Sequence, residues 1–89
     1  MRNISDVMTQ ILGLLPAPST IADPIVSGNV DVLSIEIEAL QRRSLYVAPE
    51  DDSAWRDITN LLNRYLPAPT ATSGYTWAWA ISNLMRGVS

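Results

Sequence analysis

Residues 48–69, APEDDSAWRDITNLLNRYLPAP, carry the strongest helix signal in the chain. Pro49 suits a first helical position, where its missing N–H loses no partner, and three acidic residues follow it at the positive end of the helix dipole. Pro67 disfavours helical geometry at the residue before it and so marks the end. We therefore expect a helix over residues 49–66. Its apolar side chains recur at steps of three and four, as on a helix with one buried side: Trp55, Ile58, Leu61, Leu62, Tyr65 and Leu66.

Two further segments have the same apolar period. Residues 4–15 carry a stripe of aliphatic side chains with Ser5 as the candidate N-cap. Residues 74–85 carry another, which Gly87 is expected to end. Both are predicted to be amphipathic helices.

Residues 29–43, NVDVLSIEIEALQRR, fit two interpretations. Their β-branched residues alternate with others as in a strand, but the alternation changes phase at Leu33, which a half-buried strand would not tolerate. A helix with Asn29 as its N-cap places one apolar stripe toward the core and spaces Glu38 and Arg42 for an i,i+4 ion pair. We expect the helix.

The connector over residues 16–28 contains three prolines, which favour an extended path. A short helical turn is expected near residues 19–22. The connector is too apolar for a free linker, so its larger side chains are expected to lie against the core: Ile21, Ile25 and Val26.

The sequence LPAP follows both the first and the central helix, at 15–18 and 66–69. One interpretation is a pair of related helix–LPAP–helix hairpins. The other is that amphipathic helices ended by proline share a period and therefore look alike. Both predict an all-α fold, a small bundle of about four helices.

Length and composition favour a single globular domain over residues 1–89. The hydrophobic fraction of 47% is ordinary for a folded chain. No basic segment leads into a long apolar stretch, so we expect neither a signal peptide nor a membrane span, and a cytoplasmic protein. The net charge is −3, with nine acids against six arginines, which argues against a protein built mainly to grip nucleic acid.

The available side chains exclude much familiar chemistry. The chain has no His, Cys or Lys, so it lacks the commonest general base, the thiol nucleophile and the Schiff-base amine, and Cys/His zinc sites are impossible. It has no GxxxxGK[ST] or GxGxxG phosphate-binding loop. Helix-start electrostatics explain the run Glu50-Asp51-Asp52 better than a cation site or an acid pair does. We expect no enzyme activity, cofactor or metal.

The aromatic residues offer one candidate site. Trp77 and Trp79 lie about 200° apart on a helix, so one buried stripe cannot hold both. If Trp77 faces the core, then Tyr75, Trp79 and Arg86 form a surface patch of the residue types that dominate interface hot spots. The alternative is a last helix packed on both sides, with both tryptophan rings in the core.

The sequence therefore favours a small acidic, non-enzymatic protein-binding module. Adaptors, assembly factors and inhibitors, including those that phages and mobile elements encode, are proteins of this class. Its partner is expected to be another protein or a second copy of the chain, bound through a helical surface. The alternative is a small helical regulator that binds nucleic acid through an Arg-bearing helix, with steep salt dependence. A carboxylate-based or metal-dependent enzyme using Asp51 and Asp52 is a third hypothesis.

Overall fold

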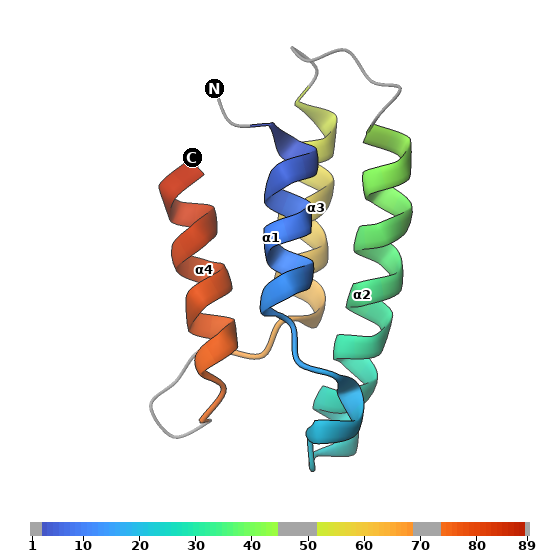
Figure 1. The fold of residues 1–89 in the computed structure, drawn as a ribbon, viewed down its shortest axis with the longest axis vertical. Helices are drawn as coiled ribbons and strands as arrows, with labels where there is room; N and C mark the ends of the chain where they lie inside the picture. Colours follow the sequence, from blue (N-terminus) through green and yellow to red (C-terminus); the bar gives the residue numbers. More distant parts are fainter. Residues whose placement is uncertain (1–2, 45–51, 69–73, 89) are drawn as a thin grey trace.

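The computed structural model describes residues 3–44, 52–68 and 74–88, and all regular structure in these ranges is helical. Figure 1 shows the four α-helices packed side by side, each running opposite to the one before it, as in an up-down-up-down bundle. The predicted all-α fold with four helices is confirmed. In chain order the elements are α1 (Ile4–Leu14), the 3-10 helix η1 (Pro18–Thr20), α2 (Pro24–Ser44), α3 (Ser53–Tyr65) and α4 (Thr76–Val88).

Helix α1 begins one residue after Asn3, whose side-chain oxygen accepts hydrogen bonds from the N–H groups of Ser5, at 2.8 Å, and Asp6, at 3.4 Å. Asn3 is therefore the N-cap, and the prediction of Ser5 was wrong. Ser5 lies inside the first turn, where its carbonyl and hydroxyl oxygens accept hydrogen bonds from the Gln41 amide of α2. This contact helps to fix α1 against α2.

Helix α2 begins five residues earlier than predicted. The Asp23 carboxylate accepts hydrogen bonds from the N–H groups of Ile25, at 2.9 Å, and Val26, at 3.4 Å, and Pro24 fills the first helical position. The connector is correspondingly short, and η1 forms the expected turn within it. Ile25 was expected in the core but is 73% exposed, because it belongs to the first turn of a helix whose inner face lies elsewhere.

The alternating residues of α2 become two apolar faces of one helix. Residues two apart in sequence lie about 200° apart around a helix. Val30 and Ile37 are accordingly fully buried, while Val32 and Ile35 are 37% and 57% exposed. The pattern that resembled a strand thus gives α2 an inner stripe and an outer one.

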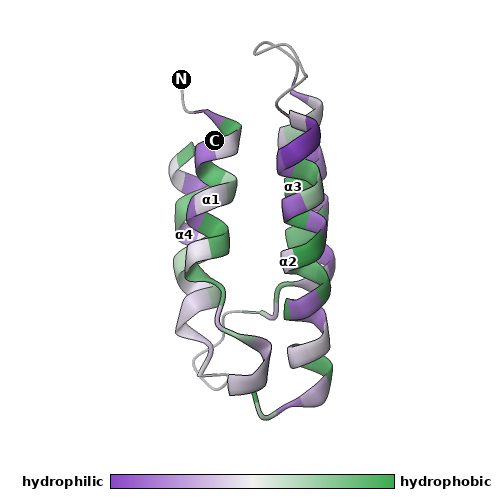
Figure 2. Cartoon of the chain, turned by 45° about the vertical axis from the view of Figure 1, so that its right-hand side comes forward, coloured by the Kyte–Doolittle hydropathy of each residue, from purple (hydrophilic) through white to green (hydrophobic). Residues whose placement is uncertain are grey.

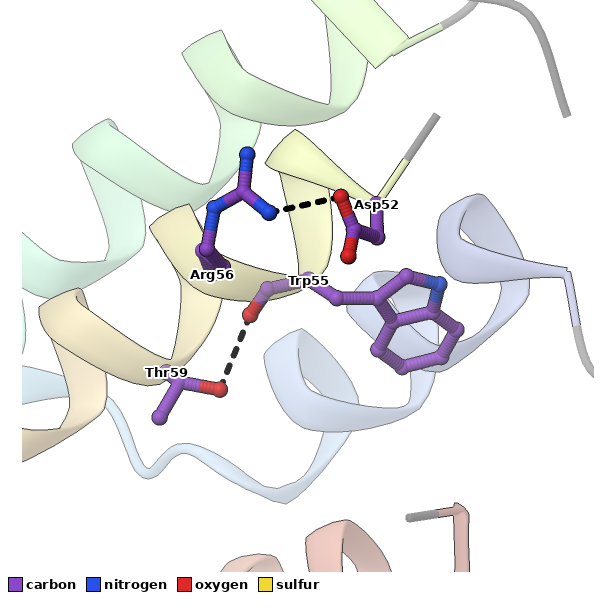
Figure 3. Close-up of polar contacts among 4 residues, drawn as sticks. All are labelled: Asp52, Trp55, Arg56 and Thr59. Atoms are coloured by element: carbon purple, nitrogen blue, oxygen red, sulfur yellow. Dashed lines mark hydrogen bonds and ion pairs between the residues drawn. The ribbon is translucent and has the colours of Figure 1, made fainter. Parts of the chain in front are cut away.

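Helix α3 begins at Ser53, and its expected start at Pro49 lies outside the described residues. An i,i+4 ion pair forms between Asp52 and Arg56, with 2.6 Å between carboxylate and guanidinium (Figure 3). The pair expected between Glu38 and Arg42 does not form among the described residues.

The two LPAP turns end their helices in the same way. Leu15 after α1 and Leu66 after α3 are both extended, with φ/ψ of −70°/131° and −75°/128°. In each, the N–H bonds the carbonyl four residues back, in Ile11 and Leu62 respectively. The backbone likeness follows from the proline after each leucine, which favours an extended conformation there.

Helix α4 starts after Gly74, whose φ of 73° lies in the left-handed region that glycine tolerates best. It runs through Gly87 to Val88, so the expected stop at Gly87 was wrong. A single glycine in the final turn weakens a helix without ending it, and the sequence has no stronger helix breaker there.

One hydrophobic core joins all four helices. The helices contribute unequally to this core: α2 and α3 pack against each other along their length, whereas α4 packs chiefly against α1. Among the described residues no polar side chain is buried. The buried cluster consists of Val7, Met8 and Ile11 of α1, Leu33, Ile37 and Leu40 of α2, Ala54, Ile58 and Leu62 of α3, and Ile81 of α4.

Candidate functional site

The two tryptophans of α4 lie in different environments. Trp77 packs against the core cluster, whereas Trp79 is 52% exposed. Their separation of about 200° around the helix produces this difference, and the alternative in which both rings are buried was wrong.

The three predicted site residues are placed differently. Tyr75 precedes α4, so the helical period does not fix its direction, and its ring centroid lies 5.5 Å from that of Trp77. Trp79 and Arg86 are seven residues apart within α4 and therefore share one of its faces. The Arg86 guanidinium donates a hydrogen bond of 2.7 Å to the Asn83 side chain, also in α4. The structure thus places Trp79 and Arg86 on one face of α4, and it places the Tyr75 ring beside that of Trp77 with the two planes tilted by 47°.

A groove of about 580 Å³ lies between α3 and α4. It exists because α4 packs on α1 and leaves the facing sides of α3 and α4 apart. Arg86 lines it, and so does Ser82, one turn beyond Trp79. Most of the other lining is apolar. The groove is formed by Thr59, Leu62, Asn63, Leu66, Pro67 and Ala68 on the α3 side and by Ser82, Met85 and Arg86 on the α4 side.

Sequence reasoning assigned Leu66 and Met85 to apolar stripes and did not foresee that they would line an open groove. One signal was present, because the apolar stripe of α3 is wide and includes both Leu61 and Leu62. A stripe of that width can exceed what one neighbouring helix covers. Periodicity alone does not say which helix lies opposite.

A second groove, of about 240 Å³, separates α2 from α3. Its lining is charged where that of the first is apolar, and none of its residues was predicted as a site. They are Glu36, Leu40 and Arg43 of α2 with Asp57, Asn60, Leu61 and Arg64 of α3.

The acidic residues of the described ranges do not gather into a metal site. No group of three carboxylates lies close enough to hold an ion in residues 3–44, 52–68 and 74–88. Glu50 and Asp51 fall outside these ranges, and Asp52 pairs with Arg56. In the same part of the chain, no helix has both the length and the hydropathy needed to cross a bilayer.

Comparison with known proteins gives no relative from which a function could be carried over. No protein-family model, curated protein or solved structure matches the chain.

Proposed function

We propose that this protein is a non-enzymatic protein-binding module, an adaptor, assembly factor or inhibitor, whose partner occupies the groove between α3 and α4. The observation that carries the proposal is the position of Arg86, which lines the groove and also shares a face of α4 with the half-exposed Trp79. Tryptophan and arginine are the residue types most enriched at interface hot spots. The partner would therefore meet both an apolar trough and a polar aromatic rim.

The shape and chemistry of the groove support a partner helix or an extended segment. Two helices form its walls, and amphipathic helices commonly bind in such troughs through apolar anchors. Leu66 and Met85 supply apolar contact, while Arg86 is the charged residue of the lining. A carboxylate on the partner would pair with that guanidinium, which presents several N–H donors in a plane.

Tyr75 has a supporting part in this proposal. Its ring rests against Trp77, and Trp77 packs on the core. Tyr75 would thus hold the beginning of α4 in place and fix the direction in which Trp79 projects.

The experiment is a pull-down with the tagged chain, with captured proteins identified by mass spectrometry. Wild type, Trp79→Ala and Ser82→Arg are compared, the last placing a long cationic side chain in the groove. Ile25→Ala is the matched control, because Ile25 is 73% exposed and lies on α2. Circular dichroism establishes that all four chains fold.

A partner held by wild type and the control but lost by both other variants would support the proposal. If the Ser82→Arg variant retained that partner, the groove would not be the binding site. Duplex DNA at low salt is the second bait, and tight, salt-sensitive retention would favour the nucleic-acid alternative.

A further inference from the structure

The charged groove between α2 and α3 is built from one sequence pattern used twice. Residues 36–43 read EIEALQRR and residues 57–64 read DITNLLNR. Both octets have an acid first, isoleucine second, leucine fifth and arginine eighth. The first lies in α2 and the second in α3, two helices that pack together and run in opposite directions (Figure 1).

The four matched positions of the two octets lie in similar parts of the hairpin. The isoleucines, Ile37 and Ile58, are fully buried in the core. The leucines, Leu40 and Leu61, line the groove together with the acid and the arginine of each octet. The likeness at these four positions therefore extends from the core to the surface of the hairpin of α2 and α3.

Antiparallel packing turns this repeat into an alternating charge pattern. The acid that begins one octet lies level with the arginine that ends the other, so Arg43 and Asp57 are at one end of the groove and Glu36 and Arg64 are at the other. Figure 2 shows hydrophilic bands interleaved with hydrophobic ones along these two helices. Opposite corners carry the same sign of charge.

Within the part of the chain that the structure describes, none of the four charged residues forms an ion pair, and all four side chains are exposed. The Arg64 guanidinium carbon lies 6.0 Å from the centre of the Tyr65 ring. By contrast, Asp52 and Arg56 of α3 pair at 2.6 Å.

A surface with this pattern is complementary to itself. When a second copy is turned by 180° about an axis lying in the surface, either along or across the groove, every positive corner meets a negative one. We propose that the α2–α3 face, defined by Glu36, Leu40, Arg43, Asp57, Leu61 and Arg64, is the interface of a symmetric homodimer. It is separate from the groove between α3 and α4.

Apolar contacts next to the charges would supply most of the affinity. Exposed ion pairs contribute little free energy by themselves, although they fix register and exclude wrong partners. Leu61 lines the groove and is half-buried, and Val32, one turn before Glu36 on α2, is 37% exposed. A second copy seated on this face would cover Leu61 and contact Val32 at its edge.

Two arrangements satisfy the charges. With the axis along the groove, α2 meets α3 of the other copy and Arg43 pairs with the partner's Asp57. With the axis across the groove, α2 meets α2 and Arg43 pairs with the partner's Glu36. In both, the reversal of any one corner places like charges opposite each other twice, once for each copy.

The test measures self-association of the full chain by sedimentation velocity over a range of concentrations. Wild type is expected to dimerise, and Arg43→Glu, Asp57→Arg and Glu36→Arg are each expected to raise the dimer Kd about tenfold or more. Mixing Arg43→Glu with Asp57→Arg restores the dimer in the first arrangement, and mixing Arg43→Glu with Glu36→Arg restores it in the second.

Arg42→Glu is the matched control, because it makes the same change at the same helix end but lies outside the groove lining. It should leave the dimer Kd unchanged, as should Trp79→Ala. A wild type that stays monomeric at every concentration overturns the proposal. So does a dimer that all three reversals leave intact, or one that neither mixture restores.

Discussion

Helices α3 and α4 are both thirteen residues long, yet the fold uses them differently. Helix α3 buries Ala54, Ile58 and Leu62, packs along α2 and presents charged residues outward. Helix α4 is richer in apolar and aromatic residues but fully buries only Ala78 and Ile81. Helix α4 therefore lies at the margin of the core: Trp77, Leu84, Met85 and Val88 pack against it partly buried, and Trp79, 52% exposed, faces solvent.

The largest expected effect on stability comes from removing a buried side chain of α3, the helix that contributes more to the core. Ile58→Ala removes a fully buried side chain between α3 and the core and should lower the free energy of unfolding by about 3 kcal/mol. Ile81→Ala in α4, equally buried, should cost less because α4 has fewer neighbours that hold the cavity open. Urea unfolding followed by circular dichroism measures both. Equal losses would contradict the contrast between the helices.

The tryptophans of α4 sharpen the comparison within one helix. Trp77→Ala should cost about 2 kcal/mol, since a partly buried ring is lost from the edge of the core. Trp79→Ala should change stability by about 0.5 kcal/mol or less, as substitutions of exposed residues usually do. Thermal unfolding measures the stability of both variants. If Trp79→Ala lost as much stability as Trp77→Ala, the Trp79 ring would have a structural role in the fold.

The glycines at the two ends of α4 should respond to alanine with opposite signs. Gly74 has a φ of 73°, so Gly74→Ala should destabilise the chain by about 1 kcal/mol. Gly87 lies in the last turn of α4, and a Cβ there meets nothing within 4 Å. Gly87→Ala should therefore stabilise by about 0.5 kcal/mol. Denaturant midpoints give both signs, and a stabilising Gly74→Ala would contradict the turn geometry.

The smallest expected effect concerns the surface of α3. Asp52 and Arg56 are 73% and 66% exposed, so Asp52→Asn should cost about 0.2–0.5 kcal/mol at low ionic strength. The difference from wild type should shrink in high salt, because screening weakens exposed pairs. Urea unfolding at two salt concentrations measures it, and a loss that salt leaves unchanged would point to a role of Asp52 in capping instead.

The existence of each helix was predictable, because apolar residues three and four positions apart are a local signal for a helix. The ends of the helices were harder to predict. Asp23 followed by Pro24 is a start signal for α2 that was present in the sequence, but the surrounding prolines and Gly28 favoured a connector. Tyr75 could not be placed because it lies just outside α4. A helical-wheel projection that includes Tyr75 assumes a helical backbone at a residue that lies outside the helix.

The grooves depend on tertiary arrangement and were beyond local patterns. The paired octets at 36–43 and 57–64 are visible in the sequence, but their charges alternate only because α2 and α3 are antiparallel neighbours. Likewise, Met85 and Leu66 face one groove only because α4 packs on α1. Which helices become neighbours depends on the whole set of apolar faces, which no single stretch specifies.

The docking of α4 on α1 has a consequence for folding kinetics. Helices α1, α2 and α3 pack as neighbours along the chain, whereas α4 must return to the first helix. Bringing together segments that far apart costs loop entropy that contacts between adjacent helices avoid. The first three helices can therefore condense as one early unit, with α4 joining last. The helix that arrives last is also the one expected to detach first, in local openings that leave the other three in place.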